Sequence, residues 1–199
     1  SIKEKYRSLL LTEGIDFEEN NHSEEIILKA GEIIKSPGIP VTPLLTEVKK
    51  KGIPVISEIE FASRHTGAKL IMITGTNGKT TTTLLTHHIL QNAGLNAGLA
   101  GNVGSSFALK VASEDHDIYV LEISSFQLDG MFRAKAGISV LLNITPDHLD
   151  RYEYNFNNYI DSKFRIVNNQ TETDHFVYCN DDPVITDRLF KMDLRPVAH

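Results

Sequence analysis

The sequence predicts an α/β fold, in which parallel sheets carry helices on both faces. An apolar run at 69–74 enters a glycine-bracketed turn, and a helical pattern leaves it. Three later runs, at 117–124, 138–144 and 175–179, are continuously apolar, as is typical of strands covered on both faces. A separate strand–helix alternation precedes residue 69, so we expect two parallel-sheet units.

The composition limits the classes of protein to which this chain can belong. Its 199 residues, 41% of them hydrophobic, can form one large domain or one and a half small ones with a buried core. The net charge of −6 argues against a nucleic-acid partner, which needs a basic stripe. No apolar run approaches the ~18 residues that cross a membrane. One cysteine, Cys179, excludes an internal disulfide and suits a reducing compartment, so we expect a cytoplasmic protein.

The first 67 residues are predicted to form short helices and strands joined by turns. A helix is expected at 4–13, with Gly14 as its stop. A second helix should begin with Thr42 as N-cap and Pro43 in its first turn, and end at Gly52. Its expected buried stripe is Leu44, Leu45 and Val48. The other expected elements are a strand at 15–18, a short helix from 23, strands at 32–35 and 53–57, a rigid turn at 36–40 and a linking helix or connector at 58–67. Because a parallel layer normally opens with a strand, we expect the opening unit to be missing from this sequence.

The remaining residues continue the alternation. We expect helices at 80–93, 105–112 and 155–167, and a short strand at 97–100. Gly94 suits the C-terminal end of the first of these helices. Its inward-facing residues should be Leu84, Leu85, Ile89 and Leu90.

The turn at 74–81 has the features of a phosphate-binding loop. Glycines let the backbone turn sharply and point N–H groups at an anion, and the next helix adds the positive end of its dipole. Lys79 would reach the terminal phosphates of a nucleotide, and the Thr80 hydroxyl would ligate Mg²⁺. The nucleotide-binding residues are predicted to be Gly75, Thr76, Asn77, Gly78, Lys79, Thr80 and Thr81. The spacing is shorter than in the common pattern, so a plain strand–turn–helix corner is the alternative.

Two further strand ends carry polar residues that could meet this loop, because ligands of parallel sheets bind at the carboxyl ends of strands. Glu122 ends one strand and could hold Mg²⁺ near the phosphates; the alternative is a solvated strand end. Pro146 stops another strand and leaves Asp147, His148 and Asp150 on a loop. An imidazole is a good ligand for a divalent ion, although a loop histidine is usually only solvated.

Three other residues need separate interpretation, and two of them, Asn102 and Lys163, have two alternatives each. Asn102, between glycines, could hydrogen-bond a ligand or occupy a left-handed turn. Ser124 lacks the surroundings of a nucleophilic serine. Lys163 lies at the edge of the apolar stripe of helix 155–167, where a charge is costly without a partner. Snorkelling of the lysine to the rim is the alternative to a functional role.

Four stretches together resemble the Mur ligases, which build the peptide of bacterial cell-wall precursors. They are Thr-Gly-Thr-Asn-Gly-Lys-Thr-Thr at 74–81, Gly-Asn-Val-Gly at 101–104, Leu-Glu-Ile-Ser-Ser-Phe-Gln-Leu at 121–128 and Leu-Asn-Ile-Thr-Pro-Asp-His-Leu-Asp-Arg-Tyr at 142–152. The short glycine spacing is normal in this family. Within it, the run at 124–128 and Ser-Pro-Gly-Ile-Pro at 36–40 most resemble the members that add D-glutamate.

The resemblance implies ATP-dependent amide-bond formation. The carboxylate of UDP-N-acetylmuramoyl-L-alanine would take the γ-phosphoryl group, and the amine of D-glutamate would attack the acyl phosphate. One magnesium ion would be held by Thr80 and Glu122, and a second by Glu122, His148 and Lys163. The matching lysine in the family is carbamylated.

By the same resemblance, Gly38, Asn102 and Ser124 would lie near the UDP-linked substrate, and no obligate protein partner is implied. Residues 1–67 would be part of a Rossmann-like UDP-substrate-binding domain, and residues 68–199 an incomplete central ATPase domain with a P-loop core. A C-terminal domain that binds the amino acid would be absent, so we expect this chain alone to be inactive. Two alternatives remain: another Mur-type amino-acid ligase, or a nucleotide-binding module without catalysis.

Overall fold

The computed structural model describes residues 2–199, which divide into two compact units. The first unit comprises the residues up to 33 together with 41–55, and the second comprises 34–40 and 56–199. No helix in the described part of the chain is long and apolar enough to cross a membrane.

The first unit contains three helices: α1 (Glu4–Thr12), α2 (Glu24–Ile27) and α3 (Pro43–Lys50). As predicted, Thr42 caps α3 by accepting a hydrogen bond from Leu45 N, and Leu45 and Val48 are buried. The strand predicted at 15–18 is wrong. In the described residues this stretch belongs to neither sheet, and the Glu18 carboxylate instead accepts a 2.8 Å hydrogen bond from Ser23 N, just before α2. The short strands β1 (Ile33–Ile34) and β2 (Val55–Ile56) pair where the two units meet in the sequence.

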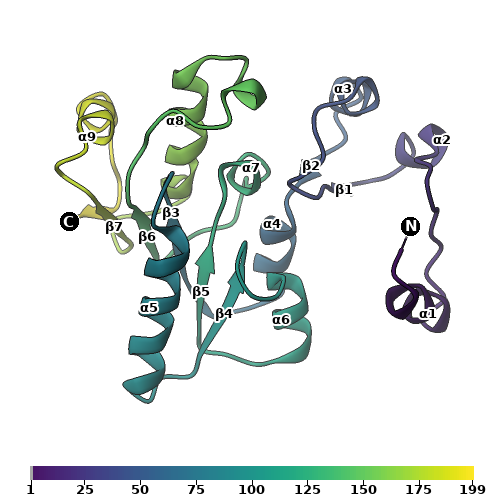
Figure 1. Ribbon diagram of the computed structural model, residues 1–199, viewed down its shortest axis with the longest axis horizontal. Helices are drawn as coiled ribbons and strands as arrows, with labels where there is room; N and C mark the ends of the chain where they lie inside the picture. Colours follow the sequence, from purple (N-terminus) through teal and green to yellow (C-terminus); the bar gives the residue numbers. More distant parts are fainter. Residues whose placement is uncertain (1) are drawn as a thin grey trace. The chain divides into compact units, whose positions relative to one another are not determined.

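The second unit is built on a parallel six-stranded sheet with the order β4-β5-β3-β6-β7-β8 (Figure 1). The strands are β3 (Lys69–Thr74), β4 (Ala97–Gly101), β5 (Ile118–Glu122), β6 (Ile138–Leu141), β7 (His175–Tyr178) and β8 (Val197–Ala198). The helices are α4 (Glu58–Ser63), α5 (Lys79–Asn92), α6 (Phe107–Ser113), α7 (Ser125–Leu128), α8 (Phe156–Phe164) and α9 (Pro183–Leu189). Because β5 and β6 both pair with β3 in parallel, the residues that follow these three strands share one edge of the sheet.

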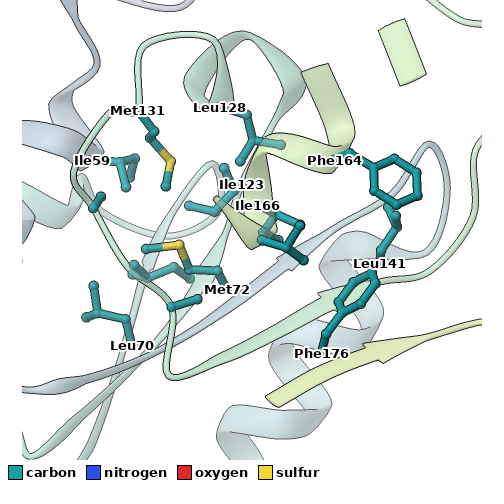
Figure 2. Packing of buried hydrophobic residues seen from close by; sticks show 14 of the residues in the cluster. Ile59, Leu70, Met72, Ile123, Leu128, Met131, Leu141, Phe164, Ile166 and Phe176 are labelled. Atoms are coloured by element: carbon teal, nitrogen blue, oxygen red, sulfur yellow. The ribbon is translucent and has the colours of Figure 1, made fainter. Parts of the chain in front are cut away.

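The main hydrophobic core lies on one face of this sheet. Figure 2 shows Met72 and Leu141 from the strands packed with Leu128, Phe164 and other residues that follow them. These side chains are at most 2% exposed. Because Leu128 of α7 and Phe164 of α8 are both part of this core, the two helices pack on the same side of the sheet. They also contact each other.

The other face is packed against α5, and here the prediction of inward residues was wrong. Leu84, Leu85 and Ile89 are 44%, 55% and 57% exposed, whereas Thr83 is fully buried. Leu90 packs against the cluster of Ile71, Ile73 and Val120, as predicted. The inward stripe is rotated because α5 begins at the fixed turn of Gly78, and this start sets which side of the helix meets the sheet.

Two elements near the end of the chain were not predicted, α9 and β8. The signal for α9 was present in the sequence, because Asp182 and Pro183 form an N-cap and first-turn pair. The Asp182 carboxylate caps α9 and also accepts a 2.9 Å hydrogen bond from Ile144 N, after β6.

Candidate nucleotide and substrate site

The turn after β3 has the backbone of a phosphate-binding loop. Gly78 has φ 81°, a left-handed conformation that favours glycine, and is the N-cap of α5. A Cβ at Gly75 would come within 3.0 Å of the Leu142 Cβ. The backbone therefore passes close to the residues after β6, and α5 starts with its N–H groups at this edge.

The loop is held by the segment that follows β6. Asn77 N donates a 2.8 Å hydrogen bond to Asn143 Oδ1, and Asn143 Nδ2 donates to Asn77 O at 3.1 Å. Thr76 N donates to Asn143 O at 3.0 Å, and Thr76 Oγ1 donates to Thr145 O at 3.1 Å. The sequence reasoning assigned no role to Asn143, although its position at a strand end was visible.

Lys79 points back along the loop. Its Nζ donates hydrogen bonds to Gly75 O at 2.9 Å and to Thr76 O at 2.8 Å. The ammonium group of Lys79 is thereby held over the turn. To bind a phosphate, it would have to give up these two hydrogen bonds. Thr81, two residues further along α5, is exposed.

Glu122 lies at the end of β5, 2% exposed. Its Oε2 accepts a 2.7 Å hydrogen bond from Thr80 Oγ1, and its Oε1 accepts one of 2.7 Å from Asn102 Nδ2. Asn102 N also donates to Glu122 O at 2.8 Å. A Cβ at Gly101 would approach Glu122 O to 2.3 Å, so only glycine fits there. The start of α5, which carries Thr80, and the residue after β4, Asn102, thus meet at the carboxylate that ends β5.

Lys163, on α8, is buried more deeply than its expected place at the edge of an apolar stripe, being 2% exposed. Its Nζ donates to Gly75 O at 2.8 Å and to Thr74 Oγ1 at 3.2 Å. Burial, and to a smaller extent the Lys79 charge, lowers the pKa of Lys163 to about 7. Asp147, Asp129 and Glu122 oppose that shift electrostatically. The amine therefore lies beside the phosphate loop and is partly neutral near pH 7.

His148 has a different setting. It has φ 49° at the start of a short 3₁₀ helix, Leu149–Tyr152, and its side chain is 55% exposed. Its Nε2 lies 3.5 Å from Asp147 Oδ2, and its ring lies 5.2 Å from that of Phe126. Within residues 2–199 no three His, Cys, Asp or Glu side chains gather as a metal-binding group.

A cavity of about 420 Å³ lies at the same edge of the sheet. It is lined by Ile34, Lys35, Ser36, Pro37, Glu58, Gly101, Asn102, Ser106 and Gln127. Asn102 therefore faces this cavity as well as Glu122. Gly38 directly follows the lining segment, and Ser124 caps α7 in a reciprocal capping box with Gln127.

The fold and this edge define a parallel α/β domain with a phosphate-loop turn. The model of the Mur ligase middle domain matches residues 73–197, and the chain belongs to this family. Curated relatives named UDP-N-acetylmuramoylalanine–D-glutamate ligase are 59% identical over 98% of the chain in Bacteroides thetaiotaomicron and 53% identical over 98% in Christiangramia forsetii. The chain spans 44% of the length of each of these relatives.

Solved structures have the same fold at low identity. The UDP-N-acetylmuramate:L-alanyl-gamma-D-glutamyl-meso-diaminopimelate ligase of Neisseria meningitides is 20% identical, with a TM-score of 0.64 over 99% of this chain and 67% of that one. The MurF ligase of Thermotoga maritima, solved in complex with ADP, is 18% identical, with a TM-score of 0.54 over 86% of this chain and 50% of that one. Both confirm the predicted α/β fold class.

Proposed function

We propose that the protein carrying this chain joins D-glutamate to UDP-N-acetylmuramoyl-L-alanine at the expense of ATP. The observation that carries the proposal is the meeting of Thr80, Asn102 and Glu122 beside the phosphate loop, between the loop and the 420 Å³ cavity. The names of the relatives at 53–59% identity support the choice of substrates.

In the proposed reaction the alanine carboxylate attacks the γ-phosphorus of ATP. The bond between the γ-phosphorus and the β,γ-bridging oxygen breaks, so that an acyl phosphate and ADP form. The amine of D-glutamate then attacks the acyl carbon, loses a proton and expels phosphate, which leaves the amide. The main obstacle is the repulsion between carboxylate and triphosphate. Lys79 and the amides of residues 75–78 would offset that charge by binding the phosphates.

The side chains present fit magnesium at the phosphate side. Glu122 supplies a buried carboxylate and Thr80 a hydroxyl, and both are hard oxygen ligands. Such an ion, when bound, supplies charge neutralisation at the phosphates. We assign a second ion to Glu122, His148 and Lys163, with Lys163 as a carbamate. A partly neutral amine, which its pKa of about 7 provides, is the form that reacts with carbon dioxide.

We assign the cavity beside Asn102 to the UDP-linked substrate, with Gly38, Asn102 and Ser124 near it. The lining includes the polar side chains of Lys35, Ser36, Asn102, Ser106 and Gln127, which could hydrogen-bond an amide- and hydroxyl-rich ligand. We further propose that residues 1–67 belong to the UDP-substrate domain and 68–199 to the ATPase domain, and that the protein acts in the cytoplasm.

The test is phosphate release from ATP by the full-length protein, measured with UDP-N-acetylmuramoyl-L-alanine and each candidate amino acid. We expect release to depend on D-glutamate. Dependence on a different amino acid would favour another Mur-type ligase, and nucleotide binding without any release would favour a non-catalytic module. The 199-residue chain by itself should release no phosphate, since no site would hold the attacking amine.

A further inference from the structure

The phosphate loop is tied to α8 by a contact between two hydroxyls. The phenol oxygen of Tyr159, on α8, lies 3.2 Å from Thr76 Oγ1 in the loop. Tyr159 is 1% exposed and stands one helical turn before Lys163. The Lys163 Nζ lies 5.3 Å from the centre of the Tyr159 ring, so this tyrosine touches both the loop and the buried amine.

The hydrogen-bond count gives the direction of this contact. Thr76 Oγ1 donates its single hydrogen to Thr145 O at 3.1 Å and accepts from Thr145 N at 3.0 Å. One acceptor position remains, so the Tyr159 phenol must be the donor. Burial raises the pKa of Tyr159, which keeps the phenol protonated at neutral pH.

The contact differs from the bonds that Asn143 and Thr145 make with the loop. Asn143 and Thr145, which hold Thr76 and Asn77, lie in a loop themselves. Tyr159 instead lies on a helix packed in the main core, through neighbours such as Ile160 and Phe164. Together with Lys163, whose Nζ donates to Gly75 O from the same helix, Tyr159 fixes the turn to a rigid element. A turn already held in its binding conformation binds phosphate more tightly, because less ordering is needed on binding.

We infer that Tyr159 is a positioning residue for the nucleotide: its phenol donates to Thr76 and so orders the loop amides that receive the phosphates. This inference rests on the proposed function, in which the loop binds ATP. In this inference Tyr159 acts through Thr76 and does not itself contact the substrates.

Tyr159→Phe in the full-length protein removes the phenol oxygen alone. The matched control is Tyr152→Phe, because Tyr152 is also a buried tyrosine whose hydroxyl contacts Asp129 and Ser162 but no residue of the phosphate loop. Binding of a non-hydrolysable ATP analogue is measured by calorimetry, and the melting temperature by thermal unfolding. We expect Tyr159→Phe to raise the Kd about 3- to 10-fold, as loss of one hydrogen bond does, and Tyr152→Phe to leave it unchanged.

A double-mutant cycle identifies the partner. Thr76→Val should weaken binding, Thr76→Ser should restore it, and Tyr159→Phe should have no further effect in the Thr76→Val background. An unchanged Kd in Tyr159→Phe would overturn the inference. So would an equal loss in Tyr159→Phe and Tyr152→Phe, which would indicate general destabilisation. If the unsubstituted protein binds no ATP analogue, the proposed function fails, whatever the variants do.

Discussion

Thr80 Oγ1 donates a 2.7 Å hydrogen bond to Glu122 Oε2, across 42 residues of sequence. The bond joins the first turn of α5 to the end of β5, the strand that pairs with β3 on the side away from β6. A hydroxyl and a carboxylate at this separation can share one hard cation. The same carboxylate accepts from Asn102 Nδ2, so one of its oxygens is bonded to the start of α5 and the other to a residue that lines the cavity.

Replacement of Lys79 by alanine should abolish ATP turnover in the full-length protein. The ammonium now rests on Gly75 O and Thr76 O, and a compact charge there offsets phosphate charge as the γ-group moves. We expect kcat to fall by about 100-fold or more, measured as phosphate release. Lys110→Ala is the control, because Lys110 pairs with Glu114 on and after α6. Turnover within about twofold of the unsubstituted protein would contradict the role given to Lys79.

Glu122→Gln should weaken magnesium dependence more than nucleotide binding. Glutamine preserves the shape and one acceptor oxygen for Thr80 or Asn102, but it removes the charge that a hard cation prefers. The magnesium concentration for half-maximal activity should rise, while the Kd of the ATP analogue without magnesium should change little. An unaltered magnesium requirement would show that Glu122 is not a ligand.

Glu60 is expected to be a main stabilising residue of the second unit. Its carboxylate is fully buried, and Oε2 accepts hydrogen bonds from the N–H groups of Phe132, Arg133 and Ala134 at 2.8–3.0 Å. Glu60→Ala leaves three donors unpaired and should cost about 3 kcal/mol in the free energy of unfolding. Urea denaturation of this variant, with Glu172→Ala at an exposed site as control, measures the loss.

The pH dependence of the same residue follows from its hydrogen bonds. Burial alone would raise the pKa of Glu60, but the three N–H donors and Arg64 outweigh it and lower the pKa. A lowered pKa in the folded state stabilises the protein above the unfolded pKa of about 4.3, and this contribution is lost as pH falls through the folded pKa. The stability difference between the unsubstituted protein and Glu60→Gln should therefore shrink on acidification below that value. A constant difference from pH 7 to pH 3 would contradict this.

Lys163→Met should raise the melting temperature of the nucleotide-free protein at pH 7 and below. An ammonium buried to 2% exposure costs stability in that range, and methionine fills a similar volume without the charge. Since the pKa of Lys163 falls from 10.5 to about 7 on folding, the unsubstituted protein gains stability as pH rises through this window. The advantage of the variant should shrink between pH 7 and pH 10. Lys191→Met, at an exposed position, is the control.

The carbamate assigned to Lys163 can be tested by chemical rescue. Lys163→Ala should lose activity because the site lacks an anion, and short-chain carboxylates should restore part of it by occupying the space of the carbamate. The ammonium form donates to Gly75 O and Thr74 Oγ1, so it cannot itself ligate a cation. An unmodified amine in a magnesium- and nucleotide-bound full-length structure grown with bicarbonate would overturn the assignment.

The sequence by itself determined the fold class, the family and the glycine turn at 74–81 between a strand and a helix. These depend on local signals: apolar runs, a glycine turn before Lys79, and caps such as Thr42, all of which act within a few residues. Strand and helix positions near the loop follow from the same signals. The bounds of most elements therefore agree with the prediction to within a few residues.

Only the tertiary structure decided how the strand ends meet. That Thr80 and Asn102 share the Glu122 carboxylate depends on the pairing of β5 with both β3 and β4, which no local pattern encodes. The rotation of α5, which leaves Leu84 exposed, follows from the turn at Gly78 and not from its apolar periodicity. Burial of Lys163 likewise depends on how α8 packs over the loop, because the cost of a buried charge is accepted only where carbonyl and hydroxyl partners are brought to it.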